Sequence, residues 1–90
     1  MNTYKLIVTG RVQKVGYRRF VIEMAETLGY RGYVKNTTDG NVEVVINASY
    51  EEDLEFFISK LYDGSMFSHV EDVTCQKIDS CIFRSFEKRS

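Results

Sequence analysis

The stretch GRVQKVGYRRF, residues 10–20, is where the pattern of apolar residues changes from that of a strand to that of a helix. Apolar and polar residues alternate from Tyr4 to Val12, and this alternation predicts a strand. From Tyr17 onward the apolar residues recur at helical spacing, which predicts a helix that ends at Gly29. The apolar face of this helix consists of Tyr17, Phe20, Val21, Met24, Ala25 and Leu28.

The next two apolar runs have the composition of a pair of strands. They cover residues 30–36 and 41–47, and the sequence TTDG, residues 37–40, connects them. An Asp-Gly pair at the end of a short connection is typical of a hairpin, because glycine adopts a positive φ at low cost. We therefore expect these two strands to pair with each other.

A second helix and further strand signals follow the hairpin. Ser49 and Glu52 form a capping-box pattern that predicts the start of the helix, and Gly64 is expected to end it. The stripe expected to be buried consists of Leu54, Phe57, Ile58 and Leu61. Residues 69–78 alternate well enough for a strand, and residues 82–86 are expected to add a short terminal strand.

The order strand, helix, strand, strand, helix, strand predicts the fold class. It is the order of an α+β, ferredoxin-like βαββαβ sandwich, in which a mostly antiparallel sheet carries two helices on one face. Because 90 residues are enough for one small core, residues 1–90 are expected to form a single domain. This layout serves enzymes, RNA-binding proteins and sensors alike, so the fold leaves the function open.

Composition and charge disfavour several classes of partner. The formal net charge is −1, whereas a nucleic-acid-binding protein is expected to carry a basic excess. No apolar run approaches the length that spans a membrane, and no signal peptide is expected, because the first strand signal begins already at Tyr4. Cys75 and Cys81 fit no metal-ligand spacing and are expected to be reduced thiols. We therefore expect a cytoplasmic monomer with no nucleic-acid or membrane partner.

The loop between the first strand and the first helix is the strongest candidate for a binding site. The first backbone N–H groups of a helix have no intrahelical partner, and the helix dipole adds positive potential there, so such an end binds anions. Gly16 allows a ligand to approach the backbone closely. Arg18 lies in the first turn, where a cation is unfavourable unless an anion binds, and its planar guanidinium can hold two phosphate oxygens. Arg19 points about 100° further round the helix and is expected to be solvated.

Two motifs in the chain resemble a known enzyme family. GRVQKVGYR, residues 10–18, resembles the first signature of the acylphosphatases, whose usual form is Gly-x-Val-Gln-Gly-Val-x-Phe-Arg. GYVKNTTDGNV, residues 32–42, matches the second signature position by position. The resemblance extends from Tyr4 to about Arg89, and the fold of that family is the ferredoxin-like one.

The resemblance implies a hydrolase that cleaves the carboxyl–phosphate bond of acyl phosphates to a carboxylate and inorganic phosphate. It implies that Arg18 grips the phosphoryl group together with the backbone N–H groups of Lys14, Val15, Gly16, Tyr17 and Arg18. It also implies that Asn36 holds and orients the attacking water, with no metal, no cofactor and no covalent intermediate. The chemistry permits this, because a carboxylate leaving group departs without a general acid and a loose transition state needs little proton removal from water.

Four positions depart from the family pattern. Lys14 replaces a glycine. If that position needs a positive φ, the lysine costs on the order of 1–2 kcal/mol; if it does not, the side chain adds a cation near the phosphate. Tyr17 replaces phenylalanine, Ala48 stands where a glycine is frequent, and Lys88 stands at a place that is usually apolar. Gln13 is expected to steady the loop through side-chain hydrogen bonds. None of these changes touches Arg18 or Asn36.

Other functions remain as alternatives. One is an acylphosphatase-like module with little or no activity that binds a ligand. Another is an RNA-recognition domain, since RGYV, residues 31–34, faintly resembles part of an RNA-binding motif; however, it lies on the second strand instead of the third. Asn36, taken by itself, also suits a turn residue that bonds to its own backbone.

Overall fold

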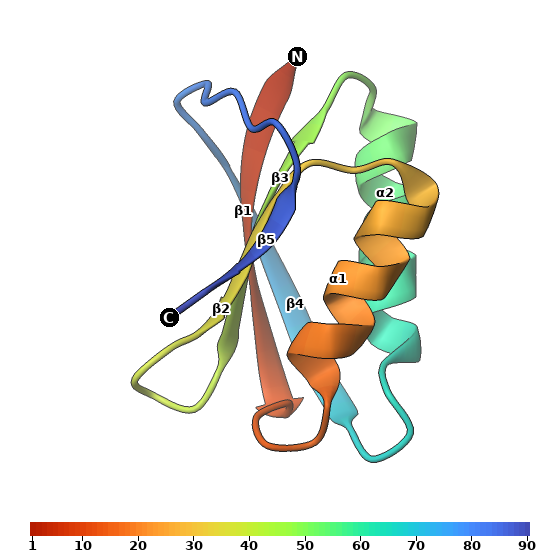
Figure 1. The fold of residues 1–90 in the computed structure, drawn as a ribbon, viewed down its shortest axis with the longest axis vertical. Helices are drawn as coiled ribbons and strands as arrows, with labels where there is room; N and C mark the ends of the chain where they lie inside the picture. The colour runs from red at the N-terminus through yellow and green to blue at the C-terminus, as the bar shows by residue number, and fades with distance from the viewer.

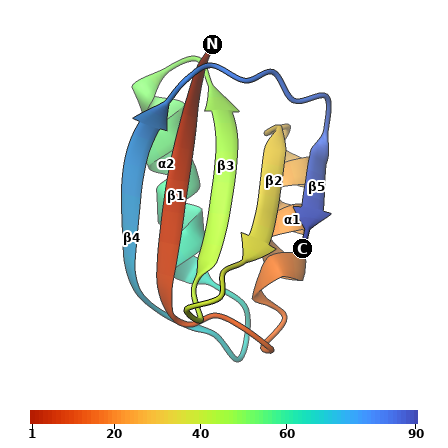
Figure 2. The same cartoon turned by 90° about the vertical axis from the view of Figure 1, so that its left-hand side faces the viewer.

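The computed structural model describes residues 1–90 and contains one five-stranded sheet with both helices packed on the same face (Figure 1). The strand order is β4-β1-β3-β2-β5, in which β2 and β5 are parallel and all other neighbours are antiparallel (Figure 2). The predicted ferredoxin-like class is confirmed, and β5 extends the sheet at one edge. The elements are β1 (Asn2–Arg11), α1 (Tyr17–Leu28), β2 (Gly32–Asn36), β3 (Val42–Ala48), α2 (Glu51–Asp63), β4 (His69–Ile78) and β5 (Phe86–Arg89).

The core lies between the sheet and the two helices. Alternate residues of the central strands face the helices and are fully buried, as the strand periodicity requires. The predicted helical stripes meet them, although Phe20, Met24 and Ile58 are only partly buried and Leu28, at the end of α1, is 42% exposed. The largest buried members are Leu6, Val8, Tyr17, Val21, Val34, Val44, Ile46, Phe57 and Leu61. Neither helix is long and apolar enough to cross a membrane.

The predicted start of the second helix is wrong. α2 begins at Glu51, and the residue before it, Tyr50, is extended and makes no side-chain cap, so Ser49 does not form the expected capping box. The backbone carbonyl of Tyr50 instead accepts hydrogen bonds from the N–H groups of Asp53 and Leu54. Acidic residues at all three positions of the first turn also stabilise this end against the helix dipole.

The predicted terminal strand is displaced along the chain. β5 covers Phe86–Arg89 instead of residues 82–86, and Ile82 is 91% exposed. The reason is a cluster that holds the segment before β5 across the end of the sheet. The side-chain amide of Asn47 donates to the Cys81 carbonyl at 2.7 Å and accepts from the Phe83 N–H at 3.2 Å. These bonds prevent residues 81–83 from pairing as a strand, and pairing begins only where the chain reaches β2.

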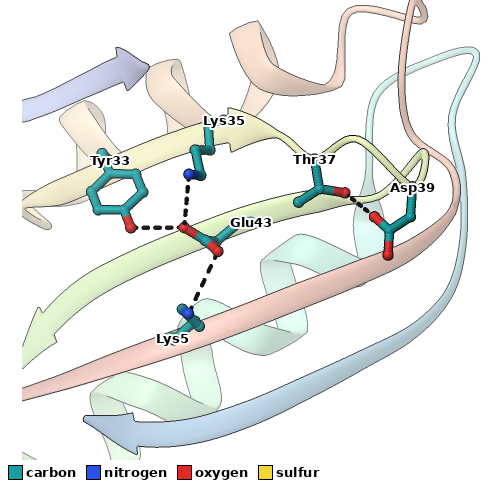
Figure 3. A network of polar contacts seen from close by, with 6 residues as sticks. All are labelled: Lys5, Tyr33, Lys35, Thr37, Asp39 and Glu43. Atoms are coloured by element: carbon teal, nitrogen blue, oxygen red, sulfur yellow. Dashed lines mark hydrogen bonds and ion pairs between the residues drawn. The ribbon is translucent and has the colours of Figure 1, made fainter. Parts of the chain in front are cut away.

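The face of the sheet without helices, called here the open face, carries a polar cluster around Glu43 (Figure 3). The Glu43 carboxylate is nearly buried and lies 3.7 Å from the Lys5 Nζ and 3.8 Å from the Lys35 Nζ. The Tyr33 hydroxyl donates to it at 2.7 Å. Burial, together with this hydrogen bond, raises the pKa of Tyr33 to about 12. The cluster therefore links the three middle strands, β1, β3 and β2, and both lysines are paired with Glu43.

Three loops meet at one end of the molecule (Figure 1). They are the β1–α1 loop, the β2–β3 turn and the α2–β4 loop. In the β2–β3 turn the Thr37 hydroxyl donates to the Asp39 carboxylate, which lowers the pKa of Asp39 (Figure 3). The candidate site lies at this end.

Candidate active site

The backbone of the β1–α1 loop has two residues in the left-handed conformation. Lys14 has φ 61° and is the only non-glycine residue of the chain with a positive φ, and Gly16 has φ 77°. Left-handed residues are typical of the turns in which successive N–H groups converge on an anion. The position of Lys14 therefore does require the conformation that glycine adopts freely, and the lysine costs on the order of 1–2 kcal/mol there.

The start of α1 differs from the start of α2 in its charges. Gly16 precedes α1 and provides no side-chain cap, and the first turn of α1 contains no acidic residue. Arg18 and Arg19 occupy this turn, whereas Glu51, Glu52 and Asp53 occupy the first turn of α2. Because free N–H groups and the dipole already make a helix start positive, the two arginines add to a positive potential that no acidic residue of this turn offsets.

The two arginines of this turn have different surroundings. The Arg19 side chain is 85% exposed and pairs with Glu23 at 3.1 Å, one turn along the helix. Arg18 is half-buried and takes part in none of the ion pairs of the protein. The guanidinium of Arg18 is therefore free to bind a ligand, and that of Arg19 is the solvated one, as the helix geometry predicts.

Hydrogen bonds to both neighbouring loops hold the β1–α1 loop in place. The Gln13 side-chain amide donates to the carbonyls of Thr37 and Asn41 in the β2–β3 turn, at 2.9 and 2.7 Å. The Ser65 hydroxyl, in the α2–β4 loop, donates to the Val15 carbonyl at 3.0 Å. The steadying role predicted for Gln13 is confirmed, and Ser65 is a support that no local sequence pattern indicates.

Asn36 lies at the end of β2, on the helix side of the sheet. Side chains alternate along a strand, and Val34, two residues earlier, is fully buried under the helices. The Asn36 Oδ1 is buried and is the only buried side-chain polar atom without a hydrogen-bond partner. The next residue, Thr37, accepts the hydrogen bond from Gln13, so Asn36 is tied to the β1–α1 loop through that contact.

A cleft of about 530 Å³ runs beside the start of α1. Of the five residues predicted to bind the phosphoryl group, Lys14, Gly16, Tyr17 and Arg18 line it. Val15 and Asn36 do not line it; the Val15 side chain packs against the core. The remaining charged residues of the lining are Arg19, Glu23 and Glu26 from α1 and Lys88 from β5.

The charges of the cleft favour an anionic ligand. Four cationic side chains face two carboxylates, and one of these carboxylates, Glu23, is paired with Arg19. No cluster of three or more His, Cys, Asp or Glu side chains is arranged to hold a metal ion. The loop offers backbone N–H groups and a guanidinium, which suit the capture of a phosphoryl group, and the buried carboxamide of Asn36 lies outside the lining of the cleft.

Lys88 lines the cleft although it lies far along the chain from both motifs. The sequence marks it only as a charge in a place where an apolar residue is usual, and the expected strand at residues 82–86 ends before it. Its place in the cleft depends on the register of β5 against β2, which no local pattern contains.

Comparison with known proteins identifies the family. The family model described as acylphosphatase matches residues 4–88. Acylphosphatase from Methanocella arvoryzae is 35% identical over 89 residues, which cover 99% of this chain and 100% of that protein. Acylphosphatase from Thermus thermophilus is 46% identical over 70 residues, 78% of each chain. The crystal structure of acylphosphatase from Bacillus subtilis superposes with a TM-score of 0.91 at 36% identity, over 100% of both chains.

The matched family and the superposed structure thus identify a small α+β hydrolase. The chain belongs to the acylphosphatase family. It hydrolyses acyl phosphates to a carboxylate and inorganic phosphate. The expectation drawn from the two motifs is confirmed on this point.

Proposed function

We propose that this hydrolysis takes place at the β1–α1 loop, by direct attack of water on the phosphorus and without a metal or cofactor. Arg18 and the backbone N–H groups of residues 14–18 bind the phosphoryl oxygens, and Asn36 orients the water. The observation that carries this proposal is the half-buried Arg18, free of any ion pair in the first turn of a helix that has no cap and no acidic residue. Such an end is costly to leave positive and is stabilised by a bound dianion.

The chemistry of the bond explains why so few groups are enough. The water oxygen forms a bond to phosphorus while the bond between phosphorus and the carboxyl oxygen breaks, and the electron pair leaves with the carboxylate. The conjugate acid of this leaving group has a pKa of about 4 to 5, so no general acid is required. The water proton passes to solvent after bond cleavage is well advanced, because the transition state is loose.

Asn36 suits the task of orienting the water. A carboxamide oxygen accepts a hydrogen bond from a water O–H, and the Asn36 Oδ1 is a buried acceptor that no protein group satisfies. It fixes the direction of attack and need not remove a proton, which agrees with a loose transition state.

The release of inorganic phosphate from benzoyl phosphate tests the proposal. Arg18→Lys keeps the charge and loses the planar fork, so we expect kcat/KM to fall by roughly 100-fold or more. Arg19→Lys is the matched control and should stay within about twofold, because its neighbour on the helix is Glu23 and its side chain is solvated. Both variants should keep the circular dichroism spectrum and Tm of the parent protein.

A chelator is included in a parallel assay because the proposed mechanism uses no metal. An Arg18→Lys variant with near-parental turnover would remove Arg18 from the mechanism. Loss of turnover on chelation, restored by added metal, would contradict the metal-free step. A parent protein that binds phosphate but releases none from benzoyl phosphate would be a ligand-binding module instead.

We also propose that residues 1–90 act as a single domain, as a cytoplasmic monomer without a nucleic-acid or membrane partner. Two observations support the proposed compartment and the absence of these partners. The net charge of −1 gives no general attraction to phosphate backbones or anionic lipids, and Cys75 and Cys81 are exposed free thiols, which are typical of a reducing compartment.

A further inference from the structure

Lys88 faces the helices from the edge strand of the sheet. In the parallel register of β5 on β2, Phe86 lies beside Gly32 and Lys88 lies beside Val34. Phe86 and Val34 are both buried on the helix side, so Lys88 projects to that side as well. Arg89, the next residue, projects to the open face, where its guanidinium lies 4.1 Å from the centre of the Tyr33 ring. The side chains of Lys88 and Arg89 thus project from opposite faces of the sheet.

Lys88 is close to the catalytic end of β2. Neighbouring strands are about 4.8 Å apart, and two residues along a strand span about 6.6 Å. The Cα of Lys88 is therefore one strand spacing to the side of Val34 and two residues short of Asn36. Its side chain lines the same cleft as Lys14 and Arg18, and it takes part in none of the ion pairs of the protein.

The cleft extends beyond the place of the phosphoryl group. It continues along α1 from the loop to Glu26, which is eight residues and therefore about 12 Å from Arg18 along the helix axis. Glu23, which pairs with Arg19, and Glu26 line the α1 side of this extension. Lys88 comes from β5 and is the one cation of the lining that belongs neither to the β1–α1 loop nor to α1.

We propose that this part of the cleft holds the acyl tail of the substrate, and that Lys88 selects acyl phosphates whose tail carries a second negative charge, a carboxylate or a phosphate. The proposal rests on the proposed function, because the phosphoryl group must be held at Arg18 for the tail to point along the cleft. Lys88 acts on specificity and takes no part in bond cleavage.

Two substrates that differ only in the tail test the proposal: benzoyl phosphate and 4-carboxybenzoyl phosphate. The measured quantity is the ratio of their kcat/KM values, anionic over neutral, at low ionic strength. Lys88→Met should lower this ratio by about 1.5-fold to fivefold, the usual range for an exposed charge pair. Lys88→Glu should lower it further. Added salt of about 0.5 M should shrink the difference between the parent and Lys88→Met, because it screens the pair.

Lys77→Met is the matched control. Lys77 lies on β4, the opposite edge strand, so the substitution removes the same charge from the molecule but not from the cleft. It should leave the ratio unchanged. Equal ratios for the parent and Lys88→Met, or equal effects of the two substitutions, would overturn the proposal. If the parent protein does not hydrolyse benzoyl phosphate at all, the proposed function has failed instead, so the two failures are distinguishable.

Discussion

Asn36 has a buried side-chain oxygen that no other group of the protein pairs with. An unpaired buried acceptor costs about 1–3 kcal/mol, and every other buried side-chain polar atom of the protein has a partner. A turn residue that bonds its own backbone would not show such an atom. The unpaired Oδ1 is the acceptor that the proposed role in orienting water requires.

Asn36→Ala separates these two roles. If Asn36 orients the water, kcat should fall by roughly 100-fold while the inhibition constant of inorganic phosphate changes little. The Tm should stay the same or rise, because the substitution removes an unsatisfied buried atom. Asn41→Ala is the matched control, since in Asn41 the backbone and not the side chain makes the contacts to Gln13 and Thr37. A lower Tm with intact kcat would instead assign Asn36 to the turn.

At Lys14 the energetic cost lies in the backbone conformation and not in an unpaired side-chain atom. Its left-handed backbone is strained, and the side chain that causes the strain adds a cation to the lining of the cleft. Nothing else in the loop requires a side chain there, because the loop is held by Gln13 and by the carbonyl of Val15. None of the contacts that hold the loop therefore accounts for the strained backbone at Lys14, and the added cation is what this side chain contributes to the cleft.

At the scale of elements, a buried hydrogen bond joins the two helices behind the site. The Tyr17 hydroxyl, at the start of α1, donates at 2.8 Å to the carbonyl of Leu61, in the last turn of α2. The last carbonyls of a helix have no intrahelical donor, so this bond satisfies a group that would otherwise be buried unpaired. Burial raises the pKa of Tyr17 far above its ordinary value. The start of α1, and with it Arg18, is thus fixed against α2.

Tyr17→Phe removes this bond and leaves the carbonyl of Leu61 unsatisfied. We expect a loss of about 1–2 kcal/mol in the free energy of unfolding. The Tm should fall by about 4–8 °C for each kcal/mol, as is usual for a domain of this size. Tyr30→Phe is the control: its hydroxyl donates at 2.7 Å to the carbonyl of Asp53, also in α2, but in contact with solvent. Water can replace that bond, so equal losses in the two variants would contradict the argument.

β5 is the element on which the proposed specificity depends. Asn47 holds residues 81–83 across the sheet and so delays pairing until Phe86, which sets Lys88 beside Val34. Thr3 completes the anchor by accepting from the Cys81 N–H and from the Asn47 side chain, both at 3.0 Å. A polar anchor at one end of the sheet thus decides which side chain reaches the cleft.

The whole molecule should lose stability in alkali. Burial is the main cause that raises the pKa values of Tyr17, Tyr30 and Tyr33 above the ordinary value of 10. A group that holds its proton more tightly when folded contributes stability that is full below the pKa of the unfolded chain. This contribution is lost as the pH rises through the folded pKa, because the unfolded chain then binds fewer protons. The loss begins near pH 10 and, for Tyr33, continues to about pH 12.

Urea unfolding between pH 8.5 and pH 12 measures this loss. Tyr33→Phe should be less stable than the parent at neutral pH, since it lacks the bond to Glu43, and the difference should narrow as the pH rises from about 10 to 12. Tyr50 is 70% exposed, and Tyr50→Phe should follow the parent curve throughout. A constant difference between the parent and Tyr33→Phe across this range would show that the Tyr33 proton does not contribute.

Local patterns in the sequence were enough to predict most of the elements and the position of the candidate loop. The bounds of α1, the hairpin of β2 and β3, and the place of Arg18 at a helix start follow from periodicity and glycine, which are local properties of the chain. The start of α2 is local as well, because the carbonyl of Tyr50 bonds only to Asp53 and Leu54, although the capping-box pattern misplaced it. The register of β5 and the entry of Lys88 into the cleft came only from the assembled sheet. They depend on Asn47, whose side chain bonds to Cys81 and Phe83, 34 and 36 positions away. Contacts at such a separation have no local pattern, so they form only when the sheet brings the segments together.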